Sequence, residues 1–250
     1  MKFLEFDSLG STNAKAHELY RSGERGPFWV RADSQTCGRG RRGRPWTSPQ
    51  GNLYASGLYA WDGSAQDAAK LSFITAIAAA RAMQAYQLIE PPQLKWPNDV
   101  LVGGKKISGI LLENISGAII IGIGVNLTSH PEDILYPATH LLEHIGPKAL
   151  SGAEPIYTGP APFLAVLARH FDELLKQYKD QGFGPIRTAW LELAYGLPGP
   201  VTVRLPNETF SGKATDLLEN GALRVALSNG TVRDVHAGDV FFGDNDASRD

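Results

Sequence analysis

The first half of the chain alternates short apolar segments with turns, a pattern typical of a sheet. Strands are expected at Phe3–Phe6, Phe28–Ala32, Asn52–Tyr59, Leu94–Val102, Lys105–Glu113 and Ala118–Leu127. Gly103-Gly104 separates two of these runs and favours a hairpin turn. Pro97 interrupts the strand before that turn, which leaves Asn98 and Asp99 accessible. The pattern predicts a mixed or antiparallel central sheet.

Longer periodic segments predict helices around this sheet. Ser11-Thr12-Asn13 precede Ala14–Tyr20 and are residue types that cap helices. Asp67–Leu88 is apolar on most faces, so we expect a helix buried against the sheet. Pro162–Lys179 is amphipathic, and Pro185–Tyr195 forms a further predicted helix. Residues 128–160 are expected to be mostly loop with one short helical piece.

The C-terminal part has a different pattern. Gly196–Pro200 is typical of a domain boundary. Short alternating strands are predicted after it, at Val201–Leu205, Phe210–Ala214, Ala222–Leu227 and Thr231–Val235. We therefore predict an α+β fold with a catalytic domain over residues 1–196, a small β domain over 197–244 and a polar tail over 245–250.

Composition fits an ordinary globular protein. The 250 residues are 43% hydrophobic, enough to bury a full core, and the net charge is only −2. The N-terminus lacks an apolar signal core, and no apolar run is long enough to span a bilayer. Cys37 is the only cysteine and cannot form an internal disulfide. We expect a cytoplasmic protein, with Cys37 as an incidental loop residue.

Against this nearly neutral background, Gln35–Trp46 is a local concentration of positive charge with four arginines and three glycines. Guanidinium groups bind carboxylates and phosphates in pairs, and glycine lets the backbone approach a ligand closely. A dinucleotide-binding turn is excluded because Pro45 and Pro49 follow where a helix would have to begin. An anionic small molecule is favoured, and a nucleic-acid-binding loop remains open as the alternative.

Three other groups suggest chemistry. Asn98 and Asp99 could coordinate Mg²⁺ or orient an amine, and Lys106 near Gly109 could stabilise charge developing on an oxygen. Glycines inside the apolar run Ala118–Leu127 indicate that a ligand or another part of the chain lies against it. His140 and His144 have the spacing of two helical metal ligands. Without a third ligand we interpret them as surface histidines and predict no metal site.

Five motifs in order resemble those of the biotin protein ligases. They are Ser11-Thr12-Asn13, Gly38–Arg44 with Trp46, Lys95–Asp99, Lys106–Leu111 and Gly122–Asn126. The resemblance is specific over residues 1–127 and looser beyond. It implies the class II synthetase-like catalytic fold of biotin and lipoate ligases, followed by an SH3-like β-barrel.

The resemblance also implies residue roles. The predicted biotin-binding residues are Ser11, Thr12, Asn13, Gln35, Arg39, Gly40, Arg41, Lys106, Gly109 and Gly122. The predicted ATP-binding residues are Arg41, Arg44, Trp46, Asn98 and Asn126. Arg41, Lys106 and Asp99 are the predicted catalytic residues. We expect the arginine loop to order over the bound intermediate.

The implied reaction uses ATP and Mg²⁺ to activate biotin as biotinyl-5′-AMP, which then biotinylates a lysine of a biotin carboxyl carrier protein of a carboxylase. A carboxylate must be activated first because oxide is a poor leaving group. Lipoate protein ligase is the closest alternative, although the arginine and Lys-Trp-Pro-Asn-Asp motifs favour biotin. We expect no DNA-binding domain ahead of Ser11, no specific operator binding and no membrane partner, and a homodimer is plausible.

Overall fold

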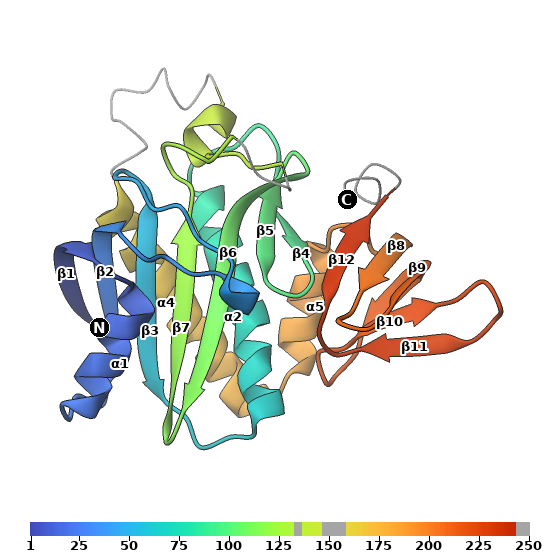
Figure 1. The fold of residues 1–250 in the computed structure, drawn as a ribbon, viewed down its shortest axis with the longest axis horizontal. Coiled ribbons are helices and arrows are strands. Elements are labelled where there is room, and N and C mark those ends of the chain that lie inside the picture. Colours follow the sequence, from blue (N-terminus) through green and yellow to red (C-terminus); the bar gives the residue numbers. More distant parts are fainter. Residues whose placement is uncertain (133–136, 147–158, 244–250) are drawn as a thin grey trace.

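The computed structural model describes residues 1–132, 137–146 and 159–243. Its centre is a seven-stranded sheet with helices on both faces, followed by a smaller sheet at the C-terminal end (Figure 1). The large sheet contains β1 (Lys2–Leu9), β2 (Phe28–Gln35), β3 (Leu53–Ala60), β4 (Gln93–Lys95), β5 (Asp99–Val102), β6 (Lys105–Ile115) and β7 (Ala118–Val125). The helices are α1 (Thr12–Arg21), α2 (Ala65–Gln84), α4 (Pro160–Gln181) and α5 (Gly184–Glu192), with 3-10 turns η1 (Arg41–Gly43) and η2 (Leu141–His144).

The strand order of the large sheet is β1-β2-β3-β7-β6-β5-β4. β1 pairs with β2 in parallel, and the remaining neighbours in this order pair antiparallel. Gly103 and Gly104 join β5 to β6 with φ values of 58° and 72°, the left-handed conformation that a two-residue hairpin requires. The predicted mixed sheet and α+β class are confirmed.

One face of the sheet is covered by α2, α4 and α5. These helices and the sheet share one apolar cluster, which includes the fully buried Leu71, Phe163 and Trp190. The amphipathic pattern predicted α4 because its buried residues recur with helical spacing along one side. α2 is buried along most of its length, as its uninterrupted apolar composition indicated.

The opposite face is covered by α1 at one end and by the segment between β2 and β3 at the other (Figure 1). Ala16 of α1 packs with Ala118 and Ile120 of β7 in a second, smaller cluster. Farther along the same face of β7 the inward positions are Gly122 and Gly124. Side chains therefore fill the space under α1, and glycines open it beyond.

The C-terminal sheet has the order β11-β10-β9-β8-β12 and is antiparallel throughout. Its strands are β8 (Gly199–Arg204), β9 (Thr209–Leu217), β10 (Leu223–Ala226), β11 (Val232–Val235) and β12 (Asp239–Phe242). Sequence patterns did not predict β12. Trp96 Nε1 donates to the Gly221 carbonyl at 3.1 Å, and Arg187 pairs with Asp216 at 2.6 Å. The C-terminal sheet is therefore held to the rest of the chain by polar contacts as well as by the apolar cluster that its strands share with the main core.

Several predictions need correction. α1 begins at Thr12, so Thr12 and Asn13 are buried helical residues, and Ser11 occupies the N-cap without a side-chain cap bond. α2 begins two residues early because Ser64 accepts a hydrogen bond from the Asp67 amide. The predicted tail over 245–250 lies outside the described residues. Among the helices that are described, none has the length and apolarity needed to cross a bilayer.

Candidate active site

A cavity of about 480 Å³ lies on the α1 face of the large sheet, a volume suited to a small-molecule ligand. Its lining includes every residue that the sequence predicted for the site: Ser11, Thr12, Asn13, Gln35, Arg39, Gly40, Arg41, Arg44, Trp46, Asn98, Asp99, Lys106, Gly109, Gly122 and Asn126. Residues separated by more than one hundred positions in the chain thus meet in one place.

Glycines of β6 and β7 form the floor of the cavity. A Cβ atom at Gly122 would lie 2.3 Å from Asn13 Oδ1, and one at Gly124 would lie 2.5 Å from the Trp46 indole. Gly109 is paired with Gly124 in the sheet and also lies under Trp46. The close neighbours that the strand glycines indicated are therefore the side chains of Asn13 and Trp46, which only glycine leaves room for.

Neutral polar groups gather over Gly122. Gln35 Oε1 accepts from the Thr12 amide at 2.8 Å, and Ser56 Oγ lies 2.8 Å from Thr12 Oγ1 and 2.5 Å from Asn13 Oδ1. Asn13 Nδ2 is buried and has no hydrogen-bond partner among the described residues. A buried donor without a partner is costly, so this nitrogen is available to a polar ligand. Ser56 was missed because a serine inside an apolar strand carries no distinctive signal.

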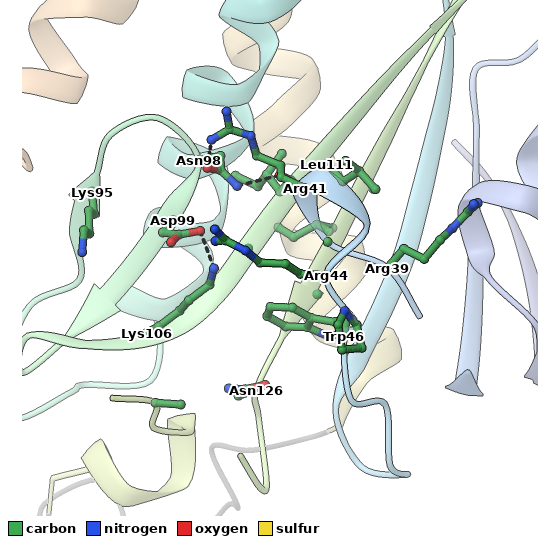
Figure 2. Close-up of a pocket in the computed structure, with 18 of the residues that line it drawn as sticks. Arg39, Arg41, Arg44, Trp46, Lys95, Asn98, Asp99, Lys106, Leu111 and Asn126 are labelled. Carbon is green, nitrogen blue, oxygen red and sulfur yellow. Dashed lines mark hydrogen bonds and ion pairs between the residues drawn. The ribbon is translucent and has the colours of Figure 1, made fainter. Parts of the chain in front are cut away.

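The charged groups lie near the ends of β5 and β6. Lys106 Nζ lies 2.6 Å from Asp99 Oδ1 and 5.7 Å from the centre of the Trp46 ring (Figure 2). Arg41 Nη1 donates to Asn98 Oδ1 at 2.9 Å, and Asn98 in turn donates to the Ile110 carbonyl. Burial lowers the pKa of Arg41 from its usual value, although Asp99 and Asp239 oppose that shift. Lys106 and Arg41 give this part of the cavity the charge that an anion needs.

The remaining arginines of the loop are directed differently. Figure 2 shows Arg39 pointing away from Asp99 and Lys106, toward α1. Arg42 and Arg44 both contact Asp239 Oδ2, at 2.9 and 2.5 Å. Asp239 is the first residue of β12, so the C-terminal sheet contributes to the cavity wall. Its ion pairs also hold the arginine loop in place. This contact was not predicted because strand β12 itself was not predicted.

Asn126 lies where β7 ends and is almost fully buried. Its side chain donates to the Thr139 carbonyl at 3.0 Å, and its backbone carbonyl accepts from the Leu141 amide. Asn126 therefore positions the segment after β7 as well as lining the cavity.

His140 and His144, interpreted from the sequence as surface histidines, are both half-buried, and their spacing does not bring the two imidazoles together. His140 is the N-cap of η2 in an extended conformation, and His144 Nε2 instead lies 2.7 Å from Thr139 Oγ1. His140 contacts His130, a residue that the sequence did not connect with it.

Comparison with known proteins places the chain among enzymes of one type. The sequence profile of the biotin/lipoate A/B protein ligase family matches residues 6–127, and that of the biotin protein ligase C-terminal domain matches residues 200–243. The biotin--[acetyl-CoA-carboxylase] ligase of Paracoccus denitrificans is 37% identical over 93% of this chain and 97% of the relative. The bifunctional ligase/repressor BirA of Bacillus subtilis is 32% identical over 95% of this chain and 73% of the relative.

A solved structure agrees with this sequence relationship. The biotin protein ligase of Aquifex aeolicus in complex with biotin and ATP superimposes with a TM-score of 0.79 at 25% identity. The superposition covers 97% of this chain and 99% of that one. The similarity therefore includes both sheets.

Proposed function

The chain belongs to the biotin protein ligase family, and we propose that its cavity performs both half-reactions of ATP-dependent biotin ligation. The observation that carries this proposal is the arrangement along β7. Asn13 lies over Gly122, while Trp46 lies over Gly124 and Gly109, with Lys106 beside Gly109 and Arg41 bound to Asn98 in the same cavity. Two residues along a strand span roughly 6.6 Å, so one ligand can reach both sets.

In the first half-reaction a biotin carboxylate oxygen attacks the α-phosphorus of ATP, forming biotinyl-5′-AMP and releasing pyrophosphate. The ureido ring is proposed to lie against Ser11, Thr12, Asn13 and Gln35, with Asn13 Nδ2 donating to its oxygen. Gly109 and Gly122 provide the floor because, without side chains of their own, they let Trp46 and Asn13 lie close to the strands beside the ligand. This orientation directs the carboxylate toward the cationic groups.

Electrostatic repulsion is the main obstacle, since one anion must approach another. Arg41 and Lys106 are proposed to stabilise the charge that spreads over the phosphate oxygens. Arg39 would have to turn inward from the direction seen in Figure 2 to reach the carboxylate. Gly40 lets the loop backbone approach the ligand, and Arg44, Trp46, Asn98 and Asn126 are assigned to the nucleotide.

Mg²⁺ is proposed to enter bound to the phosphates of ATP, whose charge it neutralises. Two carboxylates line the described part of the cavity, Asp99 and Asp239, and each is paired with a protein cation. This donor set fits an ion that is held mainly by substrate phosphates and water, with one or two carboxylates at most.

In the second half-reaction a neutral lysine amine of the acceptor attacks the biotinyl carbonyl carbon. An amide bond forms, the bond to AMP breaks and the amine loses a proton. Asp99 is proposed to accept that proton once Lys106 has turned from it toward the substrate anions. The acceptor is proposed to be the biotin carrier domain of a carboxylase, the substrate class named for the Paracoccus relative.

Two further expectations concern partners. The chain is expected not to bind operator DNA specifically, which a footprint at physiological salt would contradict. β1 is an edge strand whose residues are all exposed or half-buried, and dimerisation is proposed to use this edge. Sedimentation with and without biotin plus ATP would measure it.

The function is tested by pyrophosphate release from MgATP in the presence of biotin, lipoate or neither acid. The same mixtures should contain a carrier domain and, as a control, that domain with its acceptor lysine replaced by arginine. Biotin-dependent release with amide-linked biotin on the unmodified carrier is expected. Pyrophosphate release that requires lipoate would show that lipoate is the substrate. If neither biotin nor lipoate caused pyrophosphate release, the adenylation reaction would be contradicted.

A further inference from the structure

His130, His140 and Glu143 bring three metal-ligating groups together outside the proposed reaction centre. His130 follows β7, His140 is the N-cap of η2 and Glu143 lies within η2. Each offers one ligand atom, and these atoms lie within 4.8 Å of one another. Such clusters often arise by chance from exposed acids, but here two of the three groups are imidazoles from separate segments.

The distances between the three atoms fit a small ion. His130 Nδ1 lies 2.9 Å from His140 Nδ1, and Glu143 Oε1 lies 3.5 Å from His140 Nδ1 and 3.9 Å from His130 Nδ1. The point in the plane of the three atoms that is equidistant from them lies about 2.0 Å from each, and an ion slightly above this plane, with room for a fourth ligand, lies about 2.1 Å from each, close to the length of zinc bonds to nitrogen and oxygen. Ligand atoms on a tetrahedral zinc ion are separated by about 3.4 Å, near the mean of these separations.

The surroundings orient these groups. Glu143 Oε2 accepts from Thr139 Oγ1 at 2.6 Å, which leaves Oε1 directed toward the imidazoles. Thr139 is fully buried, so this support is fixed by the fold. The His130 and His140 side chains are 21% and 18% exposed, whereas Glu143 is 43% exposed. A hydrogen-bonded partner that holds a ligand in place is a regular feature of metal sites.

We propose that His130, His140 and Glu143 bind one divalent transition-metal ion of the zinc class, with water as the fourth ligand. Two imidazoles and one carboxylate suit zinc, whereas Mg²⁺ prefers oxygen ligands alone. This site is distinct from the nucleotide-bound Mg²⁺ and does not rest on the proposed reaction.

A metal ion at this site would stabilise one wall of the active-site cavity. Lys106 donates through its amide to the Pro137 carbonyl at 2.8 Å and accepts from the Thr139 amide at 2.9 Å. Pro131, Pro137 and Ala138 line the cavity next to these bonds. An ion that joins His130 to η2 would therefore hold together two segments that border Lys106 and Asn126.

The test uses tag-free protein that has been treated with a chelator and then dialysed. Zn²⁺ titration by calorimetry is expected to give about one ion per chain, and Co²⁺ should show the visible absorption of a tetrahedral site. His130→Ala and Glu143→Gln should each weaken Zn²⁺ binding by at least about tenfold, in line with the sensitivity of metal sites to their supporting groups. The control variant His236→Ala removes an exposed histidine next to the C-terminal strand β11 and should leave the affinity for Zn²⁺ unchanged.

Thermal unfolding provides the second readout. Zn²⁺ should raise the unfolding temperature of the native chain and of His236→Ala but not that of Glu143→Gln, which can keep its bond to Thr139. The metal-free variants should unfold near the temperature of the metal-free native chain, which establishes that they are folded. Absence of stoichiometric Zn²⁺ binding, or equal binding by the native chain and both site variants, would overturn the proposal and leave a hydrogen bond between His130 and His140.

Discussion

The two faces of β7 are built from alternate residues of one eight-residue strand, and they serve different purposes. On the face toward α2 and α4, Ile119, Ile121, Ile123 and Val125 pack into the main apolar cluster. On the other face, Ala118 and Ile120 pack against α1, and then Gly122 and Gly124 open the cavity floor. Residues one position apart therefore control stability on one side and ligand binding on the other, because strand side chains alternate.

The largest effect on the cavity side is expected for Arg41→Ala. Removing one donor that stabilises transition-state charge typically lowers the rate by about 10²- to 10³-fold. Pyrophosphate release should fall by that amount while the free energy of unfolding changes little. Arg42→Ala is the matched control because its side chain is partly exposed and pairs with Asp239. Equal losses for the two variants would show that overall loop charge, not Arg41 itself, is what matters.

On the opposite face, Ile121→Ala should act through stability. Ile121 is fully buried, and such a truncation typically lowers the free energy of unfolding by about 2–5 kcal/mol. Denaturant unfolding measures this change, and kcat per folded molecule should stay near the native value at low temperature. A variant as stable as the native chain but inactive would contradict the division between the faces.

Gly124→Ala should produce an intermediate effect on the cavity side. The new methyl group would lie 2.5 Å from the Trp46 indole, so the ring must move. If Trp46 contacts the nucleotide, KM for ATP should rise about tenfold, equivalent to about 1.4 kcal/mol of binding energy. Gly184→Ala is the control because nothing lies within 4 Å of its added atom. An unchanged KM for ATP would contradict the assignment of Trp46 to the nucleotide site.

The smallest effect is expected for Asp239→Asn, which weakens the contact between β12 and the arginine loop. Partly exposed ion pairs contribute about 0.2–1 kcal/mol, so proteolysis after Arg41 or Arg42 should accelerate only a few-fold. Asp234→Asn breaks a comparable pair with Arg224 and should leave loop cleavage unchanged. Equal cleavage of both variants and the native chain would mean that Asp239 does not hold the loop.

Hydrophobic patterns along the chain predicted those strands and helices that have one side continuously buried. Strand β7 and helix α4 followed from their apolar patterns, because each is buried on an apolar side along most of its length. The full set of cavity residues followed from the resemblance to the biotin protein ligases, whereas glycine and arginine spacing alone indicated only an anion-binding loop at Gln35–Trp46. Lys106 and Asp99 could be named in advance because they flank a recognisable hairpin.

Contacts between distant segments could not be predicted in this way. Asp239 and His130 meet their partners only through tertiary packing, and neither stands in a local pattern that signals it. Thr12 and Asn13 were interpreted as capping residues because helix-start chemistry is local, whereas their burial in the helix, in contact with Ser56 of β3, depends on tertiary packing. The direction of the Arg39 side chain is likewise a property of the folded loop.

Adenylation is proposed to depend on the positive charge at the end of the glycine floor. The most direct test measures biotin-dependent pyrophosphate release by the Lys106→Ala variant. The control is Lys105→Ala, which removes the exposed neighbouring lysine. We predict a loss of about 10²- to 10³-fold for Lys106→Ala and less than about twofold for Lys105→Ala. Near-native release by a folded Lys106→Ala protein would contradict the claim.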